Sequence, residues 1–200
     1  MNKRPRALPL AFYARDTLLV AQEVLGKILV RELNDAVLKG RIVEAEAYRG
    51  TDDPASHSYR GMTNRNRVMF GRPGVAYVYF TYGNHYCLNL VTEGEGVPGA
   101  VLVRALQPLD GIEIMKRNRN TGELRNLTSG PGKLTKAFAI TKQHNGLDLT
   151  VGRELFLVEP DAPPSFETAQ SRRIGIREGS DKLWRFYVQG NPFVSKKAAP

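Results

Sequence analysis

The sequence predicts a mainly antiparallel α+β domain, and three observations lead to this fold class. Short runs of strand-forming residues recur along the whole chain. Turn-forming residues join some of these runs directly, as a hairpin requires. Few helical patterns lie between them, whereas neighbouring parallel strands need a crossover connection, usually a helix. A chain of 200 residues is long enough to bury the core of one such domain.

The strands and helices can be placed from the residue pattern. The expected strands cover residues 27–32, 41–48, 75–82, 87–91, 100–106, 154–159, 173–176 and 183–188. A helix capped by Asp16 should run to about Leu25, and Asp110 with Glu113 would form a capping box for a second helix. A further helix should begin at Ser129. We expect the folded domain over residues 8–195, between a flexible basic arm at 1–7 and a C-terminal tail at 196–200.

The charge balance favours a polyanionic partner. The chain has 29 Lys and Arg against 20 Asp and Glu, a formal charge of +9, which suits nucleic acid first and an anionic membrane second. A basic protein without such a partner is the alternative. The single cysteine, Cys87, excludes an internal disulfide and a C-x-x-C metal site. We expect a cytoplasmic protein, because no run is long and apolar enough to span a membrane and the N-terminus lacks a signal-peptide pattern.

The segment at 41–48 could carry acid–base chemistry. Alternate residues of a strand share a face, so one side should be polar and the other small and apolar. The polar side would hold Ile42, Glu44, Glu46 and Tyr48, and the apolar side Val43, Ala45 and Ala47. Adjacent carboxylates push their pKa values apart, as catalytic pairs require. The alternative is an acidic strand paired with arginines, and the pattern does not choose between Glu44 and Glu46.

Residues 52–72 are polar, basic and rich in turn formers, which predicts a long functional loop. His57 lies there near Arg65, in a setting that suits contacts with phosphate groups. A structural or merely exposed histidine is the alternative. Asp52, Asp53 and His57 could bind a metal, but their spacing matches no strong metal pattern.

An aromatic hairpin follows the loop. Tyr77 and Tyr79 share a strand face, whereas Tyr82 stands beside the turn signal Gly83-Asn84. A large aromatic at a hairpin tip of a basic protein suggests a wedge between base pairs. Ordinary packing of strand aromatics is the alternative, and it suits Tyr77 better than Tyr82.

Further along the chain, the run Ser129-Gly-Pro-Gly-Lys133 opens a predicted helix. Its free backbone N–H groups and Lys133 could bind a phosphate group. A capped helix with a solvated lysine is the alternative.

Several segments together resemble the alkyladenine (3-methyladenine) DNA glycosylase family, of the type without a helix-hairpin-helix, and its bacterial members in particular. The matching runs are IVEAEAY, DDPASHS, RNRVMF, YVYFTYG with YCLN, VLVRALQP, SGPGKL, RRIGI and WRFYVQGNPFVS. They follow one another in the family's order from about Leu8 to Ser195. The resemblance implies a single domain around a curved, mainly antiparallel sheet, with flanking short helices and a protruding β-hairpin.

The resemblance also implies a reaction. Such enzymes flip an alkylated or deaminated purine, of the 3-methyladenine, 7-methylguanine, hypoxanthine and ethenoadenine class, out of double-stranded DNA and hydrolyse its N-glycosidic bond. Glu46 would be the general base that activates water, and Arg104 with the main-chain carbonyl of Ile174 would help it hold that water. Family members need no cofactor or metal and leave the sugar–phosphate backbone intact. No lysine stands near Glu46 in the strand segment, so we expect no lyase activity.

The remaining roles concern the base and the DNA. Tyr48 and His57 would form one wall of the base pocket and Tyr79 the other, with the main-chain N–H of His57 donating to the base. Asn89 would crowd out the 2-amino group of normal guanine. Three further residues would contact the DNA, namely Tyr82 in the gap left by the flipped nucleotide and Arg65 and Lys133 at the backbone.

The chain departs from the vertebrate members of that family in three ways. It lacks their N-terminal extension, has a slightly shorter loop between His57 and Arg65, and carries Asn84 where a hairpin-tip methionine is frequent. The last difference puts tip contacts beyond Tyr82 in doubt. We expect a monomer that associates with the bacterial nucleoid.

Two other functions stay open at this point. A metal-dependent nuclease could use Glu44 and Glu46 with Asp52 or Asp53. A non-catalytic RNA- or ribosome-binding module would explain the charge and the aromatics through base stacking, but it leaves the strand carboxylates unexplained.

Overall fold

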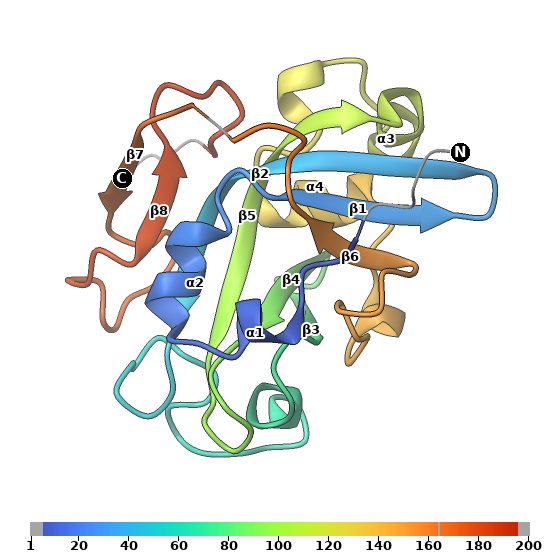
Figure 1. The fold of residues 1–200 in the computed structure, drawn as a ribbon. Helices are drawn as coiled ribbons and strands as arrows, with labels where there is room; N and C mark the ends of the chain where they lie inside the picture. The colour runs from blue at the N-terminus through green and yellow to red at the C-terminus, as the bar shows by residue number, and fades with distance from the viewer. Residues whose placement is uncertain (1–5, 164, 196–200) are drawn as a thin grey trace.

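The computed structural model describes residues 6–163 and 165–195 and confirms the predicted α+β class (Figure 1). Its four helices are short and lie around one curled antiparallel sheet. The helices are α1 (Leu10–Tyr13), α2 (Thr17–Glu23), α3 (Ile112–Arg119) and α4 (Pro131–Ala137), and the 3₁₀ turns are η1 (Arg67–Phe70), η2 (Leu124–Asn126) and η3 (Lys142–His144). The strands are β1 (Ile28–Leu33), β2 (Ala36–Tyr48), β3 (Ala76–Thr81), β4 (His85–Val91), β5 (Ala100–Asp110), β6 (Leu155–Val158), β7 (Thr168–Ser171) and β8 (Arg185–Val188).

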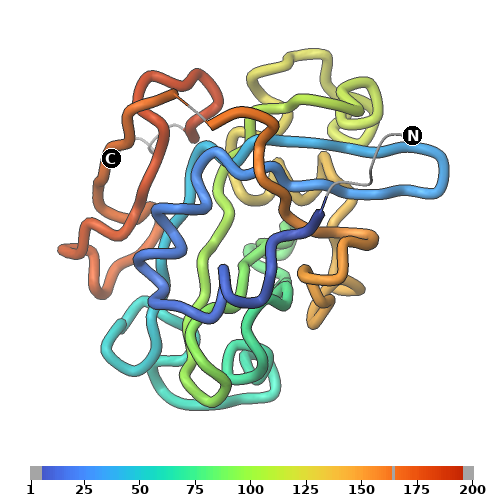
Figure 2. The backbone as a smooth tube through the Cα atoms, in the orientation of Figure 1, coloured from blue at the N-terminus to red at the C-terminus, as the bar shows by residue number. Residues whose placement is uncertain are grey.

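The sheet is organised around its two longest strands, β2 and β5. The strand order is β3-β4-β5-β2-β1-β6, and β7 and β8 form a branch in which β8 pairs with β2. The first part of β2 lies between β5 and β1, whereas Glu44–Glu46 lies between β5 and β8. The loop after β2, at 49–75, and the loop at 92–99 lie together at the lower end of the molecule (Figure 2), where Gly96 N–H donates to Phe70 O at 2.9 Å.

The main core is one continuous apolar cluster to which the sheet, α2 and α4 all contribute. It includes Leu29, Leu88, Leu106 and Phe138, all fully buried. The helix predicted after Asp16 is confirmed as α2, because the Asp16 carboxylate accepts the N–H groups of Leu18 and Leu19 at 2.9 and 3.1 Å. No helix in the described ranges, 6–163 and 165–195, is long and apolar enough to cross a membrane.

Two bulges in the central strands decide which way the functional side chains point. Ile42 pairs with Leu106 and Glu44 with Ala105, so Val43 is an extra residue in β2. Ala45 then pairs with Val103, so Arg104 is an extra residue in β5. A bulge turns the side chains around it relative to a regular strand.

Because of the first bulge, two residues lie on the side of β2 opposite to the predicted one. Ile42 packs in the main core with Ala45 and Ala47, and Val43 packs in a separate cluster with Phe193. The predicted side of these two residues was therefore wrong, since strict alternation cannot anticipate an inserted residue.

Two expected elements are absent from the described chain. The capping box was wrong: Gly111, at φ 73°, is the N-cap of α3, Asp110 closes β5, and Glu113 pairs with Lys116 at 2.7 Å. The strand at 173–176 was also wrong, because that segment is irregular and follows β7.

The predicted N-terminal arm and C-terminal tail lie mostly outside the described residues. Within the described part, Ala7 forms an isolated antiparallel bridge with Val158, so the chain joins the edge of the sheet there. Ser195, at the other end, is buried.

Candidate active site

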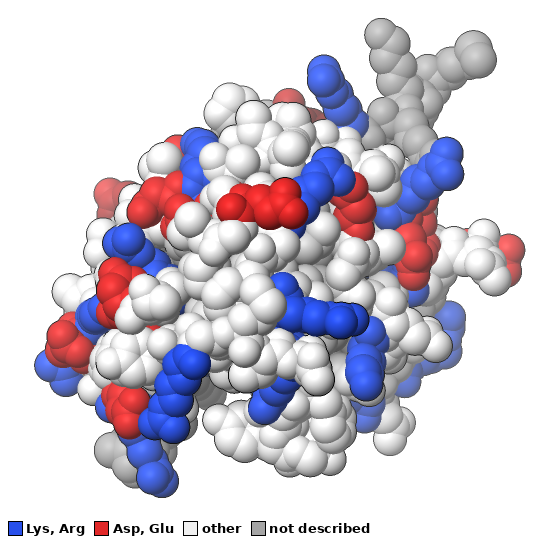
Figure 3. All heavy atoms as spheres, turned by 90° about the horizontal axis from the view of Figure 1, so that it is seen from below, with Lys and Arg blue, Asp and Glu red and all other residues white. Residues whose placement is uncertain are grey.

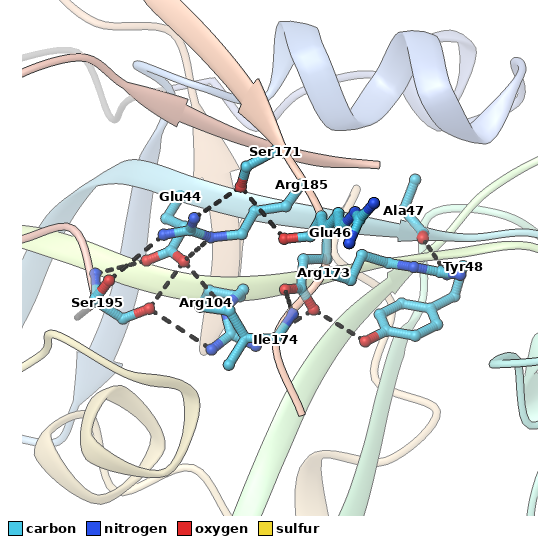
Figure 4. A network of polar contacts seen from close by, with 11 residues as sticks. Glu44, Glu46, Ala47, Tyr48, Arg104, Ser171, Arg173, Ile174, Arg185 and Ser195 are labelled. Carbon is cyan, nitrogen blue, oxygen red and sulfur yellow. Dashed lines mark hydrogen bonds and ion pairs between the residues drawn. The ribbon is translucent and has the colours of Figure 1, made fainter. Parts of the chain in front are cut away.

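Glu46 is a fully buried carboxylate near the C-terminal end of β2 (Figure 4). Its Oε2 accepts from the Tyr48 hydroxyl at 2.8 Å and from Arg104 Nη1 at 3.2 Å, and its Oε1 accepts from the Ile174 N–H at 2.8 Å. Burial raises the pKa of Glu46 above its usual value, while Arg104 and the two hydrogen bonds oppose that shift. A carboxylate with a raised pKa accepts a proton more readily, which is the property a general base needs.

Glu44 has a different environment although it lies on the same side of β2. Its Oε1 accepts from Arg104 Nε at 3.0 Å and Arg185 Nε at 2.6 Å. Ser195 donates to it twice, from the hydroxyl to Oε1 at 2.8 Å and from the backbone N–H to Oε2 at 2.6 Å. Glu44 is therefore saturated by four donors, and the alternative of arginine-paired carboxylates describes it well. The sequence pattern could not make this distinction.

Arg104 connects the two glutamates. Its guanidinium donates to Glu44 from Nε and to Glu46 from Nη1, and only 8% of its side chain is exposed. The bulge at this position in β5 aims the side chain at both carboxylates. A planar guanidinium with several fixed donors suits such bridging better than a lysine would.

A cavity of about 270 Å³ opens beside this group. Seven of the predicted site residues line it, namely Tyr48, His57, Tyr79, Tyr82, Asn89, Arg104 and Ile174. Glu46 itself is fully buried and does not line the cavity, but it is hydrogen-bonded to three residues that do, Tyr48, Arg104 and Ile174. The volume is below the roughly 300–1,000 Å³ usual for drug-sized ligands, so it suits a small group.

His57 and Tyr79 contact each other directly. Their ring centroids are 4.6 Å apart at an interplanar angle of 65°, and His57 Nδ1 is 3.0 Å from the hydroxyl of Tyr77. The Tyr77 hydroxyl holds the imidazole over β3, beside the two tyrosines that share that strand face. The expectation that His57 and Tyr79 stand on opposite walls therefore does not describe this structure, because no base fits between rings in contact.

The surroundings of His57 disfavour the charged form of its imidazole. Burial lowers its pKa, and the positive charge of Arg65 lowers it further. Arg65 also lies over the ring of Tyr79, 5.3 Å from its centroid, and donates to Phe80 O at 3.4 Å. Arg65 thus belongs to the rim of the aromatic wall. Asn89 is buried and donates to Tyr77 O at 3.0 Å, which fixes the orientation of its amide.

Arg173 is a structural link that the sequence analysis did not find. It forms a bidentate, fully buried ion pair with Asp53, at 2.6 and 2.7 Å, and donates to Ala47 O at 2.9 Å. Its guanidinium also stacks on the ring of Tyr48, 4.7 Å from the centroid. It thereby ties the loop that carries His57 to β2. Sequence spacing gives no signal for a pair 120 residues apart.

The hairpin between β3 and β4 ends in an exposed tyrosine, as predicted. Tyr82 is 82% exposed and has φ 51°, next to Gly83 at φ 69°. A non-glycine residue in this left-handed region is uncommon and marks a tight turn. Asn84, two residues further on, is also exposed. It is the residue whose difference from the vertebrate members put tip contacts beyond Tyr82 in doubt.

The predicted phosphate contact at Lys133 lies at the start of α4. Its ammonium donates to Asn126 Oδ1, and it lines a second cavity together with Arg125. Figure 3 shows the molecule from below, the side of the loop at 49–75. Lys and Arg gather over the middle and lower right of this face, and charges of both signs are mixed over the rest of it. This distribution suits a polyanion.

The carboxylates offer little to a metal ion. Glu44 is saturated by donors and Asp53 is paired with Arg173 through both oxygens. Within residues 6–163 and 165–195, no group of three His, Cys, Asp or Glu side chains could hold a metal. Cys87 is buried, as a small apolar residue would be, and lines the cavity.

The chain matches a known protein family over most of its length. The model of the family described as methylpurine-DNA glycosylase matches residues 11–192. The chain belongs to this family. A relative from Carboxydothermus hydrogenoformans is 52% identical over 190 residues, which cover 95% of this chain and 99% of the relative. A relative from Chlorobium phaeobacteroides is 50% identical, covering 94% and 96%, and one from Clostridium perfringens is 46% identical, covering 93% and 97%.

Each of these three relatives carries the name "Putative 3-methyladenine DNA glycosylase". The resemblance seen in the sequence is thus confirmed. Membership of the methylpurine-DNA glycosylase family makes DNA the substrate and hydrolysis of an N-glycosyl bond the reaction class.

Proposed function

We propose that this glycosylase removes damaged purines, of the 3-methyladenine, 7-methylguanine, hypoxanthine and ethenoadenine class, from double-stranded DNA and leaves an abasic site. The proposal is carried by the position of Glu46. This buried carboxylate has a raised pKa and is hydrogen-bonded to three residues that line a cavity of about 270 Å³. The aromatic lining of that cavity and the basic face of the molecule support the same substrate.

The damaged nucleotide must leave the helix before it can react. A base inside the stack is out of reach, and extrusion costs a few kcal/mol, less for a lesion that pairs poorly. Tyr82 fills the vacated position, since it stands exposed at the tip of the hairpin and can enter the stack without disturbing the core. Arg65 and Lys133 contact the backbone phosphates.

The flipped base stacks on the aromatic wall. Tyr48 forms one side of the pocket, and Arg173 stacks on its ring. His57 and Tyr79 together form the other side. The base stacks against this wall and not between its two rings, because His57 and Tyr79 are in contact with each other. Alkylation at N3 or N7 makes the purine cationic, and cation–π attraction contributes about 0.5–2 kcal/mol in a desolvated site. Neutral His57 adds no opposing charge.

Hydrolysis then needs one water and one base. The water oxygen attacks C1′ of the sugar, the N-glycosidic bond breaks, and its electron pair leaves with the purine. Glu46 accepts the proton of the water and its negative charge stabilises the cationic, oxocarbenium-like sugar. Arg104 and the backbone of Ile174 hold the carboxylate in place. A purine that is already cationic leaves without further protonation.

The same enzyme leaves the DNA backbone intact. A lyase needs an amine nucleophile that forms a Schiff base with the sugar, and no lysine lines the cavity within the described part of the chain. Borohydride should therefore trap no covalent complex between the protein and DNA.

The test is release of bases from methylated duplex DNA, followed by chromatography. We expect free 3-methyladenine and 7-methylguanine, unbroken strands that carry abasic sites, and full activity in EDTA. Strand cleavage that EDTA abolishes would establish a metal-dependent nuclease instead. Binding of RNA with no base release would establish the non-catalytic module.

A further inference from the structure

Ser195, near the C-terminus, contacts Glu44 and Arg104, the two residues that lie next to Glu46. Its hydroxyl donates to Glu44 Oε1 at 2.8 Å and accepts from Arg104 Nη2 at 3.5 Å, and its backbone N–H donates to Glu44 Oε2 at 2.6 Å (Figure 4). Only 7% of the residue is exposed. None of these bonds involves Glu46 directly.

The segment that carries Ser195 is anchored to the two bulged strands. Phe193 is buried against Val43, the extra residue of β2, together with Ala105 of β5. Asn191 donates to Gln107 of β5 at 3.1 Å. The C-terminal segment therefore docks on the part of the sheet that directs Arg104 and the glutamates.

Each of the three nitrogens of the Arg104 guanidinium donates one hydrogen bond in a direction fixed by the planar group. Nε donates to Glu44, Nη1 to Glu46 and Nη2 to Ser195. Because the group is planar and rigid, fixing two of these directions determines the third. The bonds to Glu44 and Ser195 therefore decide where Nη1 points.

A second arginine keeps Glu44 from drawing Arg104 away from Glu46. Arg185 donates to the same Glu44 oxygen at 2.6 Å, and it also donates to Ser171 at 2.8 Å and to Ser195 O at 3.3 Å. Two buried carboxylates thus face two buried guanidinium groups, so the charges of the cluster balance.

We propose that Ser195 and Glu44 form a positioning unit that fixes Arg104, so that its Nη1 donor stays on the Glu46 carboxylate during base release. This inference rests on the proposed role of Glu46 as the base for water. It assigns a role in the reaction to the docked C-terminal segment, which touches neither the base nor the cavity. Ser195 and Glu44 are positioning residues because they act through Arg104.

The test is Ser195→Ala, which removes the hydroxyl and keeps the backbone N–H bond to Glu44. Without the Ser195 hydroxyl, Nη2 loses its acceptor and Nη1 donates to Glu46 for less of the time. The positive charge of Arg104 then lowers the pKa of Glu46 less than it does in the wild type. We expect the single-turnover rate of 7-methylguanine release to fall about threefold at its plateau. We also expect the acidic limb of the pH–rate profile to move up by about half a pH unit, with unchanged DNA binding.

Two variants make the result specific. Thr128→Val removes a buried hydroxyl that donates to Leu106 O and has no hydrogen bond to Arg104, Arg185 or Glu44, so its profile should match the wild type. Ser195→Thr keeps a hydroxyl and should restore the position of the acidic limb. If the limb of Ser195→Ala does not move, or if its activity falls equally at every pH as its melting temperature falls, the positioning role is refuted. If the wild type itself releases no base, the proposed function fails rather than this inference.

Discussion

Replacement of Glu46 by glutamine tests the proposed chemistry most directly. Glutamine has nearly the same shape but carries no negative charge and cannot take the proton of a water molecule. All three partners of the carboxylate are hydrogen-bond donors, from Tyr48, Arg104 and the backbone of Ile174. The substitution therefore changes the chemistry of the group and leaves the volume of the site almost unchanged.

The structure sets the size of the expected effects. Loss of a positioned general base costs about 10²- to 10⁴-fold in rate, so Glu46→Gln should reduce base release at least 100-fold by that measure. Wherever the new NH₂ group lies, it meets an N–H of Ile174 or Arg104, a donor–donor contact that costs about 1–3 kcal/mol. Removal of a buried charge offsets part of this cost. The variant should therefore remain folded.

The assay is single-turnover release of 7-methylguanine and hypoxanthine from duplex DNA, beside binding to the same DNA. We expect wild-type binding, strongly reduced release and a small change in melting temperature. Release at the wild-type rate by a folded Glu46→Gln variant would refute the assignment of Glu46 as the base.

Four further outcomes are expected. Because burial raises the pKa of Glu46 and the ionised form is the base, release of a cationic lesion should slow as pH falls through that raised pKa; a flat profile down to pH 4 would contradict this. Tyr82→Ala should weaken flipping of ethenoadenine, followed by its fluorescence, with little change in stability because the side chain is 82% exposed, whereas the exposed Val151→Ala should leave flipping unchanged. Asp53→Asn should destabilise the protein by about 3 kcal/mol in chemical unfolding, because it leaves the buried Arg173 unpaired, and a change below 1 kcal/mol by the same scale would show that the pair is not needed. DNA affinity should fall steeply and linearly in log–log form as salt rises, and a salt-independent affinity would exclude binding through phosphate contacts.

The fold class was predictable because it depends on local signals. Strand patterns, the hairpin turn at Tyr82 and the cap at Asp16 each lie within a few residues, and the structure bears them out. The capping box at Asp110 failed although its pattern is equally local. There the preceding residues extend β5, and Gly111 adopts a left-handed φ of 73° to start the helix, so strand pairing outweighed the local preference.

The site was predictable only in part. Strand alternation brought Glu44, Glu46 and Tyr48 to one side, as the structure has them, but it gave no means of choosing between the two carboxylates. That choice depends on partners far along the chain: Ser195 saturates Glu44, and Ile174 donates to Glu46 from 128 residues away. Such partners are brought together by the tertiary fold, and a single sequence holds no spacing rule for them.

Of the three register shifts between β2 and β5, the two at Val43 and Arg104 act as compensating insertions. Val43 adds a residue to one strand and Arg104 adds one to the other, so that Ala45 pairs with Val103 and the ladder runs on in step. Loss of either residue alone would leave the two strands one position out of step, and a slip of one position turns every later side chain to the opposite face. Such a deletion would turn the Glu46 side chain into the apolar core, although Glu46 itself would not be substituted. The lengths of these two strands are therefore constrained by the orientation of the side chains that the site requires.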